Sequence, residues 1–153
     1  ASSDAHPPDD PEFERFPPHC VAGTPGQRRV AETTPARPRV LAPDGSPRTP
    51  DGETVLLEKT TFDLFDNPAA ERVLAETGAR TAIVFGVALD VCVRAAALGL
   101  RALGFETLLV RDATAPVTAE GGQATEAELR AAGVRSVRAD AVVRALSAAA
   151  PAA

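Results

Sequence analysis

The sequence has few cysteines, only one lysine and no long apolar run. Two cysteines, Cys20 and Cys92, are too few for a disulfide scaffold, so we expect a reduced, cytoplasmic protein. No uninterrupted apolar span is long enough to cross a bilayer. The polar, proline-rich first residues do not resemble a signal peptide. We therefore expect no membrane partner.

Basic charge is also scarce, since the 153 residues carry a net charge of −5. This balance gives no electrostatic reason to expect a nucleic acid or an anionic membrane as partner. Walker and dinucleotide glycine fingerprints are absent, and no internal repeat is visible. The length suits one core, so we expect a single domain over residues 1–153.

Lysine is nearly missing: of the 16 basic residues, 15 are arginine and the remaining one is Lys59. A lysine ammonium is a compact point charge whose pKa burial can tune, whereas arginine is a wide planar fork. A single lysine can occur by chance, so the position of Lys59 in the fold must distinguish a functional residue from a chance one. Lys59 ends the predicted strand Thr54–Lys59, and functional groups of open α/β sheets gather at the carboxyl ends of strands.

Proline divides the chain, because 12 of the 14 prolines lie within residues 1–68. Residues 1–53 are predicted to form a loop region that carries metal and substrate groups, and residues 54–149 a βαβ core. This alternation predicts a three-layer α/β/α fold with a parallel sheet. We expect strands at residues 54–59, 81–87, 105–111 and 134–138, helices at residues 68–77, 90–103, 120–132 and 140–149, and a frayed tail at residues 150–153.

The stretch at residues 81–103 organises the prediction. It is expected to form a strand covered on both faces, a tight turn at Gly86 and a helix with Cys92 near its start. A thiol in the first turn of a helix is favoured as the thiolate, and the free N–H groups there can hold an oxyanion. The alternative is that Cys92 is a small buried hydrophobe, as most free cysteines are.

A second candidate site lies in the loop region, which holds both histidines of the chain. Asp4 and His6, followed by His19, could supply one carboxylate and two imidazoles to a divalent metal ion. Such a set suits Zn, Mn or Fe(II). The alternative is a surface loop with isolated polar residues.

Five segments together resemble the isochorismatase-like cysteine hydrolases, in particular their nicotinamidase/pyrazinamidase branch. The resemblance covers nearly the whole chain, in the family's order, and rests on the co-occurrence of its motifs. The segments are SDAH at 3–6, FPPHCVAGTPG at 16–26, EKTTFDLF at 58–65, GVALDVCVRAAALGL at 86–100 and VRDATAP at 110–116.

The resemblance implies hydrolysis of a small, nicotinamide-like carboxamide through a thioester, with a place in pyridine nucleotide salvage. Cys92 would be the nucleophile, and Lys59 would stabilise its thiolate. The backbone N–H groups of Ala88 and Cys92 would form the oxyanion hole, next to a cis peptide bond between Val87 and Ala88. The implied partner is the small-molecule amide, and the resemblance leaves a homo-oligomer open.

The same resemblance implies a divalent metal beside the nucleophile. Asp4, His6 and His19 match the family's ligand positions, and Glu12 or Asp10 could fill the place of a further ligand. Phe13 matches a wall of the substrate pocket.

Two departures from the family pattern stand out. Leu89 replaces the small hydroxyl residue usual in the turn before the cysteine. The family's first strand, which ends at its catalytic aspartate, has no counterpart here, and neither Asp90 nor Asp112 takes that role. We therefore expect an amino-terminally truncated chain with impaired activity. The alternatives are a pseudoenzyme that binds or oligomerises, or another hydrolase of the same fold, amidase or isochorismatase in type.

Overall fold

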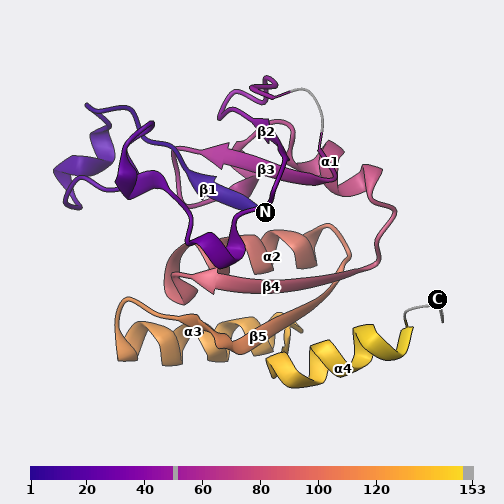
Figure 1. Cartoon of the computed structure of the whole chain (residues 1–153). Helices are drawn as coiled ribbons and strands as arrows, with labels where there is room; N and C mark the ends of the chain where they lie inside the picture. The colour runs from indigo at the N-terminus through magenta and orange to yellow at the C-terminus, as the bar shows by residue number, and fades with distance from the viewer. Residues whose placement is uncertain (50–51, 150–153) are drawn as a thin grey trace. The chain divides into compact units, whose positions relative to one another are not determined.

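The computed structural model describes residues 1–49 and 52–149 (Figure 1). Its contacts divide the chain into two compact units, Ala1–Gly78 and Ala79–Ala153. Each unit holds a three-stranded sheet whose strands all pair in parallel. Parallel strands alternating with helices confirm the predicted α/β fold. The expectation of a single domain stays a prediction, and the expected fraying of residues 150–153 lies outside the described residues.

The first unit is built on the strands β1 (Ser2–Asp4), β2 (Pro38–Leu41) and β3 (Thr54–Lys59), in the order β1-β3-β2. The predicted strand at 54–59 is confirmed with the same bounds. The register of β1 on β3 pairs Asp4 with Lys59. Two of the candidate residues therefore meet at the carboxyl ends of neighbouring strands.

The buried amide of Asn67 ties the helix of the first unit to its sheet. Its Nδ2 donates to the carbonyl oxygens of Ala42 at 2.8 Å and Glu58 at 2.7 Å, and its Oδ1 accepts from the N–H of Ala69 at 2.9 Å. The helix α1 (Ala70–Glu76) then begins two residues later than expected. The apolar core beneath it consists of Leu41, Leu57, Ala69, Ala70 and Val73.

The second unit is a parallel sheet in the order β4-β5-β6, whose strands are joined by helices. The predicted strand at 81–87 is confirmed with the same bounds, and the helices expected at 120–132 and 140–149 are confirmed to within one residue. The elements are β4 (Thr81–Val87), α2 (Arg94–Ala102), β5 (Glu106–Ala115), α3 (Ala119–Ala131), β6 (Arg135–Val137) and α4 (Ala139–Ala149).

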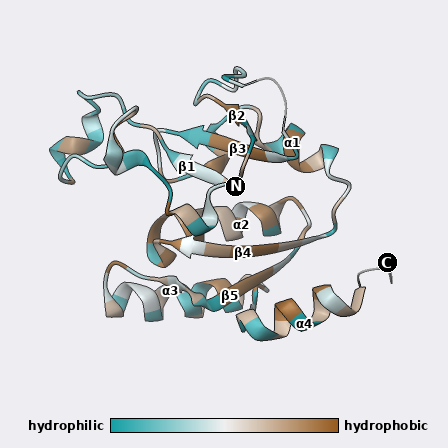
Figure 2. Cartoon of the chain, in the orientation of Figure 1, coloured by the Kyte–Doolittle hydropathy of each residue, from teal (hydrophilic) through white to brown (hydrophobic). Residues whose placement is uncertain are grey.

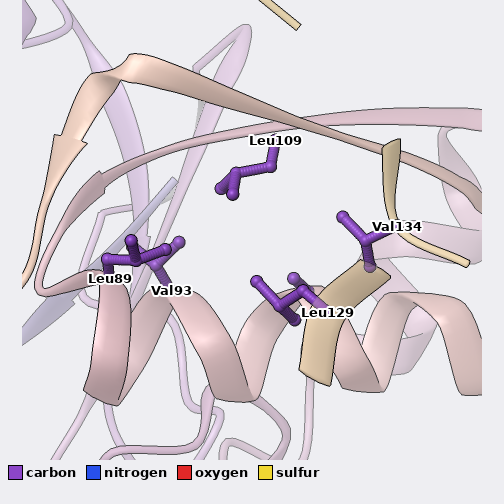
Figure 3. Packing of buried hydrophobic residues seen from close by; sticks show 6 residues of the cluster. Leu89, Val93, Leu109, Leu129 and Val134 are labelled. Atoms are coloured by element: carbon purple, nitrogen blue, oxygen red, sulfur yellow. The ribbon is translucent and has the colours of Figure 1, made fainter. Parts of the chain in front are cut away.

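The core of the second unit joins β5 to the start of the α2 segment and to α3. Leu109 of β5 lies over Leu89 and Val93, and Leu129 and Val134 close the other side of the cluster (Figure 3). Burial of each such side chain stabilises the fold by about 1.5–3 kcal/mol. The segment that carries Cys92 is thereby fixed to the sheet on both sides of the cysteine.

The strand β4 is hydrophobic along most of its length (Figure 2). Val84 packs on the core, but Phe85 and Val87 on the opposite face are 59% and 73% exposed. The expectation that both faces are covered is therefore wrong for the described residues. A continuous apolar run does not show by itself which of its faces is buried.

Two further expectations are corrected. The predicted loop region at residues 1–53 contains the strand β2, an edge strand that opens with Pro38, where a missing N–H is tolerated. The predicted helical bounds at 90–103 instead cover a π-helical turn, Leu89–Val93, followed by α2. Among the helices of the described residues, none combines the length and hydrophobicity that a membrane span requires.

Candidate active site

A parallel bridge brings the two histidines of the first unit together. After β1 ends, His6 pairs with Val21, and its N–H donates to the carbonyl oxygen of Cys20 at 3.1 Å. The ring centroids of His6 and His19 are consequently 4.9 Å apart. Residues thirteen positions apart in sequence thus form one imidazole pair.

The His6 ring is buried, with only 1% of the residue exposed. Its Nδ1 lies 3.0 Å from Oδ2 of Asp10, whereas its Nε2 has no hydrogen-bond partner within the described part of the chain. An Nδ1–H that donates to the carboxylate leaves the Nε2 lone pair free. A buried polar atom without a partner is costly, and metal-ligating histidines usually have their other nitrogen held in this way. His6 therefore has the environment of a metal ligand.

Glu12 and His19 complete a group that can hold a metal ion. One ligand atom from each of His6, Glu12 and His19 lies within 4.8 Å of the others. His19 Nδ1 lies 2.9 Å from the carbonyl oxygen of Pro17, and its Nε2 lies 3.5 Å from Glu12 Oε1. Two imidazoles and one carboxylate are a donor set that suits zinc or a similar divalent ion.

Asp10 orients two members of this group at once. One of its oxygens faces His6, and the other accepts from the N–H of Glu12 at 2.9 Å, at the start of the 3₁₀ helix Pro11–Glu14. The Glu12 N–H, and next the His6 side chain, hold the pKa of Asp10 below its ordinary value. The sequence suggested Asp10 only as a further ligand. Its four-residue spacing from His6 was the one signal that the two side chains could meet.

Asp4 is not part of this group of three. Its Oδ1 accepts a hydrogen bond from Nζ of Lys59, which also donates to the carbonyl oxygen of Thr61 at 2.7 Å. Lys59 is buried, with 3% of its side chain exposed. The structure thus brings two residues of separately predicted roles, Asp4 as a metal ligand and Lys59 as a catalytic group, into one ion pair.

Phe13 forms an aromatic contact with both imidazoles. Its ring centroid lies 5.5 Å from that of His6 and 5.7 Å from that of His19. A second aromatic pair, Phe16 and Phe62, has centroids 5.8 Å apart. The Phe13 ring beside the imidazoles suits the flat face of an aromatic ligand.

Cys92 lies in the second unit, within the π-helical turn Leu89–Val93. The peptide bond between Val87 and Ala88 is cis, as the resemblance implies. The carbonyl oxygen of Ala88 accepts from the N–H groups of Val91 at 3.2 Å and Val93 at 3.1 Å. Cys92 and Cys20 are both partly exposed.

Asp90, two residues before the cysteine, fixes the turn to the next connection. Its carboxylate accepts from the backbone N–H groups of Val117 at 2.8 Å and Thr118 at 3.3 Å. The hydrogen bond from Val117 is the main reason that the pKa of Asp90 lies below its ordinary value. Asp90 therefore has a structural role: it holds the segment that carries Cys92 to the connection before α3.

The parallel sheets with flanking helices have the α/β fold of the isochorismatase-like hydrolases. The chain belongs to the isochorismatase domain family, whose model matches residues 2–141. A segment of 64 residues is 42% identical to isochorismatase domain-containing protein 1 of Salmo salar. That match covers 41% of this chain but only 22% of the curated relative's length.

Solved structures of related proteins share the fold over most of the chain. The pyrazinamidase of Pyrococcus horikoshii in complex with zinc is 26% identical, with a TM-score of 0.74 over 90% of this chain and 73% of that one. PnC1 of L. infantum in complex with nicotinate is 27% identical, with a TM-score of 0.72 over 92% of this chain and 71% of that one. The structural neighbours thus include amide hydrolases, one of them solved with a divalent metal.

Proposed function

We propose that this chain hydrolyses a small, nicotinamide-like carboxamide to the acid and ammonia, with Cys92 as nucleophile and a divalent metal as cofactor. The observation that carries the proposal is the buried Nε2 of His6, which lies beside His19 and Glu12 and has no hydrogen-bond partner among the residues that the structure describes. Support also comes from two relatives, a pyrazinamidase with zinc and a protein with bound nicotinate. We place the protein in the cytoplasm, with the amide as its partner.

His6, His19 and Glu12 are the proposed protein ligands of the metal. Asp4 stays a predicted ligand, although its Oδ1 already accepts from Lys59. A bound divalent ion would supply a Lewis-acidic point that fixes the ring nitrogen of a heteroaromatic amide or a water molecule. Asp10 holds Nδ1 of His6 and so favours the tautomer whose Nε2 lone pair would be available to the ion, and Phe13 would offer an apolar face to the substrate ring.

In the proposed reaction the Cys92 thiolate forms a bond to the amide carbon as the carbonyl electrons move to oxygen. The N–H groups of Ala88 and Cys92 stabilise that oxyanion, and the positive charge of Lys59 stabilises the thiolate. The C–N bond then breaks, the nitrogen takes up a proton and ammonia leaves. Water attacks the thioester, which releases the acid and restores the thiol.

The family's catalytic aspartate has no counterpart that the resemblance places among residues 1–153. General acid–base assistance is commonly worth about 10²–10⁴-fold. We therefore expect the chain by itself to be a slow catalyst.

Hydroxylamine tests the covalent step, because it intercepts a thioester and turns it into a hydroxamate. The zinc-loaded protein with nicotinamide and hydroxylamine is expected to form nicotinohydroxamate. Cys92→Ala should abolish that product, and Cys20→Ala, the matched control, should not. Equal product from the Cys92→Ala variant would overturn the proposed nucleophile. An N-carbamoyl amide in place of nicotinamide distinguishes the other amidase substrates of this fold.

A further inference from the structure

Three arginines of the second unit surround one cleft, although the chain as a whole has a net charge of −5. The cleft has a volume of about 400 Å³ and lies where α3, β5 and β6 come together. Arg111 comes from β5, Arg130 from α3 and Arg135 from β6, and Ser136 adds a hydroxyl. Glu126 is the one acidic residue in the lining, which therefore carries an excess of positive charge.

Contacts within the protein leave these guanidinium groups largely available. Among the described residues, the only ion pair of Arg111 is a long one, 3.8 Å from its Nη2 to Oε1 of Glu126. Arg135 uses Nη1 to pair with Glu106 at 2.5 Å, and 68% of its side chain is exposed. The side chain of Arg130 makes no ion pair within residues 1–49 and 52–149. The cleft thus holds more donors than its own acceptors use.

The simplest structural role for these arginines would be to neutralise the carboxyl end of α3. Arg101 already fills that role, since its Nε donates to the carbonyl oxygen of Ala132 at 3.2 Å. Its Nη1 also donates to the carbonyl oxygen of Phe105 at 2.7 Å. Arg130 also lies in the last turn of α3, but the end of the helix does not account for Arg111 and Arg135, which lie on the strands β5 and β6.

We propose that this cleft binds a small organic polyanion, either a phosphate ester or a polycarboxylate. Guanidinium groups match the paired oxygens of phosphates and carboxylates, and three from different elements can grip one multiply charged group. A volume of about 400 Å³ lies within the size range of small-molecule sites, so the cleft is large enough for an organic ligand. A bound anion would compete with Glu126 for Arg111.

Calorimetric titration with adenosine monophosphate, citrate and inorganic phosphate tests the proposal. We expect saturable binding of one molecule per chain for at least one of the two organic anions, and the one that binds identifies the source of the charge. Arg130→Gln should weaken that binding about tenfold, as loss of a charged hydrogen bond does. Glu126→Gln should strengthen it, because the competing carboxylate is removed.

Arg144→Gln is the matched control, with the same change of charge on α4, away from the cleft. The Arg144→Gln variant should bind the organic anion with the same affinity as the unaltered protein. Equal weakening by Arg144→Gln would mean that only net charge matters, and would overturn the proposal. No saturable binding of either organic anion, or binding that Arg130→Gln and Glu126→Gln leave unchanged, would overturn it as well. All variants change exposed or half-exposed side chains, and their melting temperatures check that they fold.

Discussion

Nζ of Lys59 donates a hydrogen bond to Oδ1 of Asp4, across the paired carboxyl ends of β3 and β1. Lys59 is almost fully buried, whereas 22% of the Asp4 side chain is exposed. The lysine therefore depends on its partner more than the aspartate does, because a buried charge without a counter-charge is costly. The ion pair therefore joins the end of β1, which leads to the candidate metal group, to the end of β3, which leads into the loop after it.

This asymmetry predicts unequal effects of substitution in the metal-free protein. Asp4→Asn should lower the free energy of unfolding by about 3 kcal/mol, because it leaves the buried ammonium without its carboxylate. Lys59→Met should cost less, since an apolar side chain can occupy the buried position and water can reach Asp4. Urea denaturation followed by circular dichroism measures both. A larger loss for Lys59→Met than for Asp4→Asn would contradict this account of the pair.

The contact between Asp10 and His6 predicts how the metal site responds to change. His6→Ala should abolish zinc binding, because it removes a ligand. Asp10→Asn should weaken zinc binding about 10–100-fold, as loss of a ligand's supporting carboxylate does. Competition with a chromophoric chelator measures the affinities. Glu14→Gln, an exposed residue on the same 3₁₀ helix, is the control. Unchanged affinity in Asp10→Asn would show that Asp10 does not support the ligand.

The hydrogen bonds that Asp90 accepts predict that the free energy of unfolding depends on pH. Its pKa in the folded protein is lowered, chiefly by the Val117 N–H. Its contribution to stability is therefore complete above the unfolded pKa, which is about 3.9, and is lost as the pH falls through the lower folded value. Asp90→Asn should lower the urea midpoint at pH 7, and the difference from the unaltered protein should shrink below about pH 4. A difference that stays constant down to pH 3 would contradict the carboxylate's role.

The two cysteines allow an internal comparison of thiol reactivity. We predict that iodoacetamide alkylates Cys92 about tenfold faster at pH 7 than it does in the urea-unfolded chain, because an activated cysteine is held as the thiolate. Cys20 should show no such acceleration. Peptide mass spectrometry separates the two sites in one sample. If Cys92 reacted at its unfolded rate, it would be a structural thiol instead of a nucleophile.

The sequence alone predicts the long, regular elements well. The strands at 54–59 and 81–87 combine β-branched residues with clear ends, and the helices at 119–131 and 139–149 follow capping or turn residues. Local chemistry decides such elements, so they can be identified without knowledge of their neighbours. The strand β2 was missed because its proline-rich surroundings indicate a loop, and only its pairing with β3 makes it a strand.

The metal group was predictable in part. Both histidines stand in recognisable motifs, and the sequence prediction included them. Their approach to within 4.9 Å between ring centroids depends on the bridge between His6 and Val21, which leaves no local pattern. The pairing of Asp4 with Lys59 is equally invisible in sequence, because it follows from the register of β1 on β3. The exposed face of β4 was equally unpredictable, since a hydrophobic run indicates a strand but does not show whether other elements cover both of its faces.

The most direct test of the proposed function is ammonia release from nicotinamide by the zinc-loaded chain, measured beside its Cys92→Ala variant. The account predicts slow release by the unaltered chain and none by the variant. Release that persisted in Cys92→Ala, or no release by a chain shown to hold zinc and to fold, would contradict it.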